Sequence, residues 1–222
     1  QPPVYPPFFE VPVKAEARAV YNNILPGSDG QYRVDLGAFD HAIEKDTTAF
    51  LLCNPHNPLG RVFTRDELLG MAESCLRRKM VIIADEIHCD LIFSGYQHIP
   101  IASLDQEVAA STVTLIAPSK TFNIAGLDCS ILICQDRELR ERIKQAKRGL
   151  MGGVNLLGMA AAVAAYRDGA SWLAEVIAYL ETHRDHLITY LEEKLPRIRV
   201  VKPEATYLAW LDCRELNLPI SP

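Results

Sequence analysis

Short apolar runs alternate along this chain with segments of helical periodicity, and this alternation restricts the fold more than any other feature of the sequence. A helix is predicted to begin at Thr64, where Glu67 completes a capping box. The continuously apolar run Ala49–Cys53 is predicted to be a strand that is covered on both faces, and three further strands are predicted at Val81–Ala84, Thr112–Ile116 and Ile131–Cys134. We therefore predict an α/β fold in which a mostly parallel sheet is flanked by helices.

The character of the sequence changes after Gly152. An Ala-rich helix is predicted over Val154–Arg167 and a long amphipathic helix from about Ser171 to Lys194, followed by two strand candidates, Arg199–Val201 and Thr206–Leu211. These last segments resemble the start of a small α+β domain that the chain does not complete. We therefore expect three parts: residues 1–168 in an incomplete large domain, 169–195 as an interdomain helix, and 196–222 as a truncated C-terminal domain.

Composition excludes several classes of protein. Apolar residues make up 49% of the chain, too many for intrinsic disorder, and its net charge of −5 argues against nucleic-acid and anionic-membrane partners. The apolar runs are shorter than a membrane span, and no signal peptide precedes them. The six cysteines form no CxxC pair, so we expect reduced thiols and a cytoplasmic location. Because the sequence starts without methionine, we also expect it to be part of a longer protein.

Polar side chains follow three of the predicted strands, where ligands bind in open α/β sheets. Asn57 lies in a rigid NPHNPLG segment, which could also be a simple turn. Asp85 directly follows a buried strand, so its charge needs a cationic partner, unless it caps a turn or belongs to a metal site with neighbouring Glu86 and His88. Lys120 follows the third strand, and a desolvated lysine amine there is suited to Schiff-base chemistry, although many such lysines lie on the surface.

Lys120, Asp85 and Asn57 together supply what a bound pyridine aldehyde needs: an amine, a carboxylate for the ring nitrogen, and a donor to the phenolic oxygen. The segments NPHNPLGRVFT, ADEIHCDLIF and APSKTFNIAG resemble the pyridoxal-phosphate (PLP) enzymes of the aspartate-aminotransferase fold. With QPPVYPPF upstream, the chain resembles the branch of cystathionine β-lyase-like C–S lyases that includes MalY and PatB. The resemblance extends from Gln1 to about Leu211.

The resemblance implies a PLP cofactor and roles for these three residues. Lys120 would form the aldimine and move the proton between substrate Cα and the cofactor. Asp85 would pair with the pyridinium nitrogen, and Asn57 would donate to the ring oxygen O3′.

Three further cofactor contacts follow from the resemblance. His88 takes the place of a tyrosine near O3′, unless it only supports Asp85. Tyr5 would lie flat against the ring, or else pack in its proline-flanked loop. Ser119 would bind the phosphate, or else serve as a turn residue. The arginine that holds the phosphate in many relatives is replaced by residues 127–130, LDCS.

The predicted function is that of a C–S β-lyase, which cleaves a sulfur amino acid through a quinonoid to pyruvate, ammonia and a thiol. An aminotransferase is the first alternative, because the early steps are shared. A non-catalytic regulatory or binding protein that retains the fold is the second. The resemblance also implies a small amino-acid substrate and a homodimer, with no nucleic-acid or membrane partner and no metal.

Overall fold

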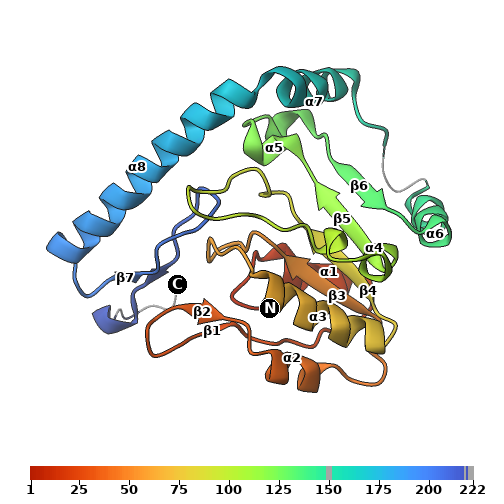
Figure 1. Ribbon diagram of the computed structural model, residues 1–222, viewed down its shortest axis with the longest axis horizontal. Helices are drawn as coiled ribbons and strands as arrows, with labels where there is room; N and C mark the ends of the chain where they lie inside the picture. Colours follow the sequence, from red (N-terminus) through yellow and green to blue (C-terminus); the bar gives the residue numbers. More distant parts are fainter. Residues whose placement is uncertain (149–151, 218, 220–222) are drawn as a thin grey trace.

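A four-stranded sheet forms the centre of the molecule. The computed structural model describes residues 1–148, 152–217 and 219. The strands lie in the order β3 (Ala49–Cys53), β4 (Val81–Asp85), β5 (Thr112–Ile116) and β6 (Ile131–Cys134), as Figure 1 shows. The first three strands are parallel and β6 is antiparallel to β5. The predicted mostly parallel sheet is therefore confirmed, with one antiparallel edge.

One face of the sheet is covered by α3 (Arg65–Arg77), with α2 (Leu36–Ala42) and α4 (Gln106–Ala110) beside it (Figure 1). The predicted capping box starts α3: Thr64 Oγ1 accepts from the Glu67 backbone N–H at 3.2 Å, and Glu67 Oε2 accepts from the Thr64 N–H at 2.9 Å. The core lies between this helix and the strands, where the fully buried side chains include Leu52, Leu68, Met71 and Ile82.

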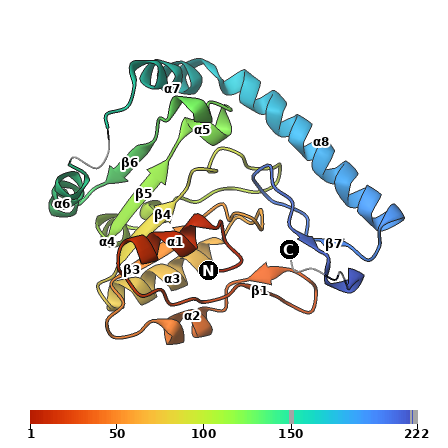
Figure 2. The same cartoon turned by 180° about the vertical axis from the view of Figure 1, so that it is seen from behind.

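The opposite face is covered much less. The short helix α1 (Pro7–Lys14) lies in front of β3 and β4 in Figure 2, where a hairpin of β1 (Leu25–Pro26) and β2 (Tyr32–Arg33) is also visible. On the edge strand β6, the side chains of Ile131, Leu132 and Ile133 are 38–47% exposed. The helices α5 (Pro118–Thr121) and α6 (Arg137–Lys147) flank β6 in the chain.

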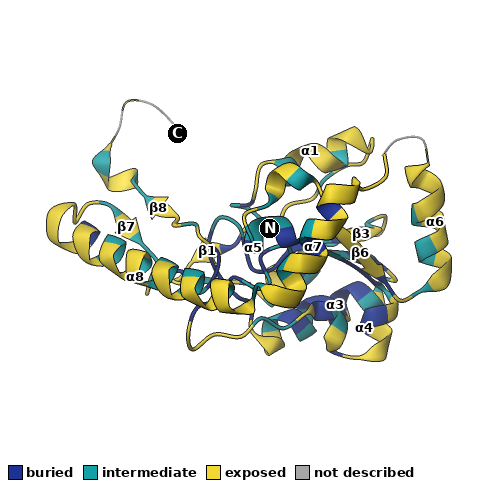
Figure 3. Cartoon of the chain, turned by 90° about the horizontal axis from the view of Figure 1, so that it is seen from above, coloured by how far each residue is buried: buried dark blue, intermediate teal, exposed yellow. Residues whose placement is uncertain are grey.

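Two helices and a small hairpin complete the described chain. Helix α7 (Leu156–Asp168) and the 25-residue α8 (Ala170–Lys194) lie close to their predicted positions, and Figure 3 shows most of both as exposed. Three short 3₁₀ turns span Ile101–Ser103, Ala125–Leu127 and Arg214–Leu216. The predicted division into three parts stays a prediction.

The second predicted C-terminal strand is wrong in its position. The observed pair is β7 (Arg199–Val200) with β8 (Leu211–Asp212), antiparallel, so only the last residue of the predicted 206–211 strand is in it. Thr206 has a left-handed φ of 69°, which a strand does not allow. Its backbone N–H donates to Leu91 at 2.8 Å, so this segment is bound to a distant loop instead of to β7.

Candidate functional site

Asp85 ends β4 and lies on the less covered face of the sheet. Side chains alternate along a strand, so Asp85 shares its face with Ile83, opposite the buried Ile82 and Ala84 that pack on α3. Its Oδ1 accepts from the Ile87 backbone N–H at 3.3 Å. Burial raises the pKa of the Asp85 carboxyl, and the adjacent Glu86 carboxylate raises it further. A buried carboxylate of this kind is stabilised by a cation.

Lys120 lies close to both Asp85 and His88. It is half-buried on α5, the single helical turn that follows β5 and begins with Pro118. Its positive charge partly offsets the burial that raises the pKa of Asp85, and it adds to the burial that lowers the pKa of His88. The structure thus brings three of the six predicted site residues together at neighbouring strand ends.

His88 is buried, with only 3% of its surface exposed. Within residues 1–148, 152–217 and 219, neither of its ring nitrogens has a hydrogen-bond partner. Burial lowers the pKa of His88 to about 4, so the ring is neutral at pH 7 and offers one donor and one acceptor. Unpartnered buried nitrogens are costly, and a ligand with a polar atom would satisfy them.

Tyr5, in the N-terminal segment, and Asn57, in the loop after β3, form a second pair. The Tyr5 backbone N–H donates to the Asn57 carbonyl at 3.0 Å, and the Asn57 N–H donates to Cys53 Sγ at 3.4 Å. Cys53 is the register partner of Asp85, so this loop starts beside the Asp85 strand end. Tyr5 is 43% exposed and Asn57 is half-buried. Ser119, also half-buried, directly precedes Lys120 on α5.

A buried hydrogen-bond network beside Asp85 was missed by the sequence reasoning. The His98 Nε2 lies 3.0 Å from Glu86 Oε2, and Glu86 Oε1 accepts from the Ile101 N–H at 3.1 Å. On its other side, His98 Nδ1 lies 3.5 Å from the Asn54 amide, whose oxygen accepts from the Phe63 N–H. Glu86 is 1% exposed. A second carboxylate directly after Asp85 was the available signal, but nothing local indicated His98.

A second feature that the sequence did not reveal is a clasp, the segment 203–206, which binds two loops near the site. The Gly60 carbonyl accepts from the N–H groups of Glu204 (2.8 Å) and Ala205 (2.9 Å). On the other side, the Phe93 N–H donates to the Glu204 carbonyl at 3.0 Å, and Ile92 forms a bridge with Ala205. The clasp therefore joins the loop after β3 to the loop after β4.

The clasp also brings Tyr207 to His88. The two rings meet edge to face, with centroids 5.4 Å apart, and Tyr207 is 45% exposed. Gly60 permits this arrangement, because its φ is 66° and a Cβ there would lie 2.8 Å from the Cβ of Pro203. Tyr207 is therefore a site residue that only the tertiary structure reveals.

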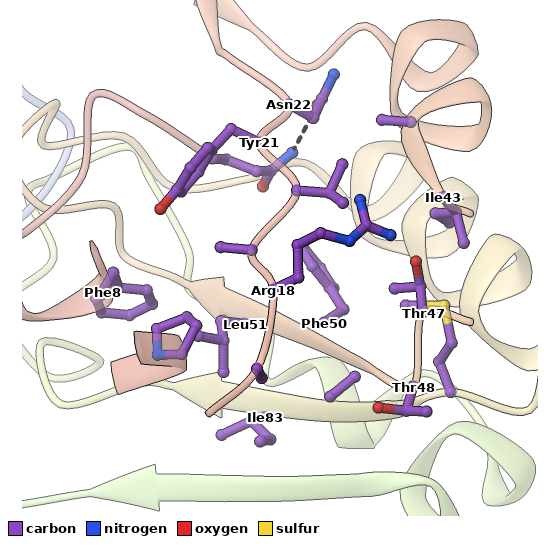
Figure 4. Close-up of a pocket in the computed structure, with 18 of the residues that line it drawn as sticks. Phe8, Arg18, Tyr21, Asn22, Ile43, Thr47, Thr48, Phe50, Leu51 and Ile83 are labelled. Carbon is purple, nitrogen blue, oxygen red and sulfur yellow. Dashed lines mark hydrogen bonds between the residues drawn. The ribbon is translucent and has the colours of Figure 1, made fainter. Parts of the chain in front are cut away.

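An apolar hollow of about 460 Å³ lies elsewhere on the same face (Figure 4). Among the residues labelled in the figure are Phe8, Tyr21, Leu51 and Ile83. None of the six predicted site residues lines it. Leu51 and Ile83 precede Cys53 and Asp85 by two residues, so the hollow lies further back along the strands, with the polar residues Arg18, Asn22 and Thr47 also in its lining.

Two other searches concern only the part of the chain that the structure describes. No group of three His, Cys, Asp or Glu side chains is placed there to hold a metal ion. No helix there is long and apolar enough to span a membrane.

The fold and the Lys120–Asp85–His88 cluster define a class of protein. The family model for aminotransferase class I and II matches residues 3–218, and the chain belongs to this family. The resemblance seen in the sequence is thereby confirmed.

The chain is similar to several individual members of this family. The chain is 42% identical over 214 residues to cystathionine beta-lyase PatB of Bacillus subtilis, covering 96% of this chain and 55% of that protein. It is 35% identical to the structure of cystalysin from Treponema denticola, which contains a pyridoxal 5′-phosphate cofactor (TM-score 0.94; 98% and 55% of the two chains). The structure of N-succinyldiaminopimelate aminotransferase from Mycobacterium tuberculosis is 30% identical (TM-score 0.86; 98% and 55%). The chain thus spans about half the length of the relatives it matches.

Proposed function

We propose that the protein is a PLP-dependent C–S β-lyase that cleaves a cystathionine-like amino acid to pyruvate, ammonia and a thiol. The observation that carries the proposal is the cluster of Lys120, Asp85 and His88 at adjacent strand ends. Two relatives support it by name, since PatB is a cystathionine beta-lyase and cystalysin contains the cofactor.

The chemistry of the donor set fits PLP. The cofactor has an aldehyde, a ring nitrogen that carries a proton, and a phenolic oxygen. The site offers an amine on Lys120, a buried carboxylate on Asp85 whose raised pKa marks the need for a cation, and two unpartnered nitrogens on His88. We assign Asn57 as a second donor to the phenolic oxygen, Tyr5 to the ring face and Ser119 to the phosphate.

When bound, PLP supplies a sink for the electron pair that is left when the Cα–H bond breaks. The Lys120 Nζ accepts that Cα proton as general base. Asp85 keeps its charge directed at the ring nitrogen, and the Ile87 N–H holds its carboxylate in place. His88 stays neutral, so it can donate a hydrogen bond without adding a second positive charge beside Lys120. The Lys120 ammonium then returns a proton to the departing sulfur as the Cβ–S bond breaks.

An aminotransferase is the second candidate, favoured by the likeness to N-succinyldiaminopimelate aminotransferase. The same residues serve both reactions up to the removal of the Cα proton. The two functions differ in where that proton goes next. In a lyase it leaves with the β-substituent, whereas in an aminotransferase it returns to the cofactor side.

The deciding experiment incubates the intact protein with PLP and cystathionine, without any keto acid, and measures pyruvate. We expect pyruvate from the wild type, none from Lys120→Ala, and turnover reduced by a factor of about 10² or more in Asp85→Ala, because a preorganised charge is lost. Lys144→Ala on α6, an exposed lysine paired with Glu141, is the matched control and should behave as wild type. Keto-acid-dependent amino transfer without pyruvate would contradict the lyase.

We further propose that the intact protein is a cytoplasmic homodimer acting on a small amino acid. The family resemblance supports this, as do the exposed apolar side chains on α7, of which Leu156 is 76% and Leu157 is 70% exposed. Sedimentation equilibrium of the intact protein measures the association.

A further inference from the structure

The helix that carries Lys120 is too short to hold itself in place. It has four residues, one turn, and a single turn is unstable without tertiary contacts. Two of its residues, Pro118 and Thr121, are buried, while Ser119 and Lys120 are half-buried. The direction of the lysine side chain therefore depends on what anchors α5 to the rest of the site.

One anchor of α5 is apolar. Phe122, directly after the helix, packs against Tyr166 on α7 and Trp172 on α8, with ring centroids 5.6 Å and 5.9 Å away. This packing holds the end of α5 against α7 and α8 through Phe122, which follows the helix, and not through a residue of the turn itself. A rotation of one residue position moves a side chain by about 100° around a helix.

The second anchor is directional. The Thr121 hydroxyl donates to Asp90 Oδ2 at 3.0 Å, and Thr121 is only 1% exposed. Asp90 lies two residues after His88, in a turn closed by the Leu91 N–H donating to the His88 carbonyl at 3.0 Å. This single bond joins the turn that carries Lys120 to the turn that carries His88. Because the acceptor is a carboxylate, the bond is of the stronger, charge-assisted kind.

We propose that Thr121 and Asp90 are a positioning pair that sets the direction of Lys120 toward Asp85 and His88. Neither residue is assigned a contact with the cofactor or substrate; both act through the α5 backbone. The inference rests on the proposed function, because the amine that they position is the one that condenses with PLP.

The test measures that condensation in the intact protein, where the Lys120 amine adds to the PLP aldehyde carbon and water leaves. The first readout is the rate at which the visible absorption of lysine-bound PLP appears. The second is the fraction of PLP that borohydride reduction traps on Lys120. Thr121→Val keeps the shape and removes the hydroxyl, so we expect condensation about 10-fold to 100-fold slower, the effect of a misplaced reacting group. Thr121→Ser retains the donor and should restore a rate close to that of wild type.

Thr112→Val is the matched control. Thr112 is equally buried, at 1%, and its hydroxyl donates to the Val108 carbonyl at 2.7 Å, but it lies at the far end of β5. The same substitution there should cost stability and leave the condensation rate unchanged. Asp90→Ala removes the acceptor of the Thr121 hydrogen bond, so it should slow condensation as Thr121→Val does. Condensation in the double variant should be little slower than in either single variant.

The outcomes separate the two proposals. A wild-type rate in folded Thr121→Val or in folded Asp90→Ala overturns the positioning pair and leaves the proposed function intact. If Thr112→Val slows condensation as much as Thr121→Val does, the positioning pair is overturned too, because the slower condensation would then come from a general loss of stability. A wild type that never forms lysine-bound PLP overturns the proposed function, and the pair with it.

Discussion

Asp85 and Glu86 are consecutive carboxylates in very different surroundings. Asp85 faces the site and accepts one weak backbone hydrogen bond at 3.3 Å, whereas Glu86 points the other way and is held by His98 and the Ile101 N–H. Consecutive strand residues alternate in direction, which places one carboxylate for a ligand and the other for the structure. The two adjacent carboxylates thus have separate roles.

His88 makes folding dependent on pH. Its pKa is lowered by burial from 6.5 to about 4, so between these values the unfolded chain binds a proton that the folded protein does not. Stability is therefore full above pH 6.5 and decreases as the pH falls toward 4, by about 3 kcal/mol for a shift of this size. Urea unfolding at several pH values should show that, as the pH falls, the free energy of unfolding decreases less in His88→Asn than in the wild type.

The exposed His186 on α8 provides the control for this prediction. His186→Asn should retain the wild-type pH dependence. If His88→Asn and wild type lose stability in parallel, the protonation of His88 is not the cause.

At the scale of elements, α8 is attached to the site by polar contacts near its middle. Glu181 accepts from the backbone N–H (2.8 Å) and hydroxyl (2.9 Å) of Ser94, and the Arg184 guanidinium lies over the Phe93 ring, 4.6 Å from its centroid. The loop after β4 is therefore held by α8 on one side and by the clasp on the other. Two elements far apart in sequence together determine the position of this loop.

Gly60→Ala should weaken the clasp. An L-residue at a φ of 66° costs about 1–2 kcal/mol, and the new Cβ would also lie 2.8 Å from Pro203. Gly95→Ala is the matched control, because Gly95 has a φ of 88° but nothing within 4 Å of its Cβ position. Urea unfolding should show a larger loss of stability for Gly60→Ala than for Gly95→Ala. Equal losses would mean that crowding at Pro203 does not matter.

The elements that sequence patterns predicted are those whose signals are local. The runs at 49–53, 112–116 and 131–134 became strands with the predicted bounds, and Thr64 caps α3 as expected. The approach of Asp85 and Lys120 to each other was predictable, because Asp85 ends β4 and Lys120 lies in the segment that follows the neighbouring strand β5. His98, Tyr207 and β8 were not predictable, since their positions depend on contacts with residues far away in sequence, such as Gly60 and Leu91.

At the scale of the whole molecule, apolar side chains are left uncovered on one side. They include residues of β6 and of α7, where Leu156, Leu157 and Val163 are 60–76% exposed. The core lies on the α3 side of the sheet, where Phe50, Leu52, Ile82 and Ala84 of β3 and β4 are buried. Apolar side chains that are exposed next to one another, such as Leu156 and Leu157, favour association or the binding of apolar ligands.

The chain of residues 1–222 by itself should therefore bind a hydrophobic dye such as ANS. Substituting Leu156→Gln together with Leu157→Gln should reduce dye fluorescence and change the free energy of unfolding by less than about 0.5 kcal/mol, because both side chains are exposed. Leu68→Ala, at a fully buried position, should instead cost about 2–5 kcal/mol. Dye binding that is unaffected by the double substitution would place the exposed apolar surface elsewhere.

The clasp also determines when the site can form during folding. Its bond from the Val62 N–H to Glu204, 2.7 Å long, joins residues 142 positions apart. Contacts of such separation close a long loop at an entropic cost that local strands and helices do not incur. The sheet with Asp85 and Lys120 is built from nearer contacts, so we expect it to assemble first and Tyr207 to reach His88 in a later step. We thus expect the site to be completed by a segment that is synthesised well after the strands that carry Asp85 and Lys120.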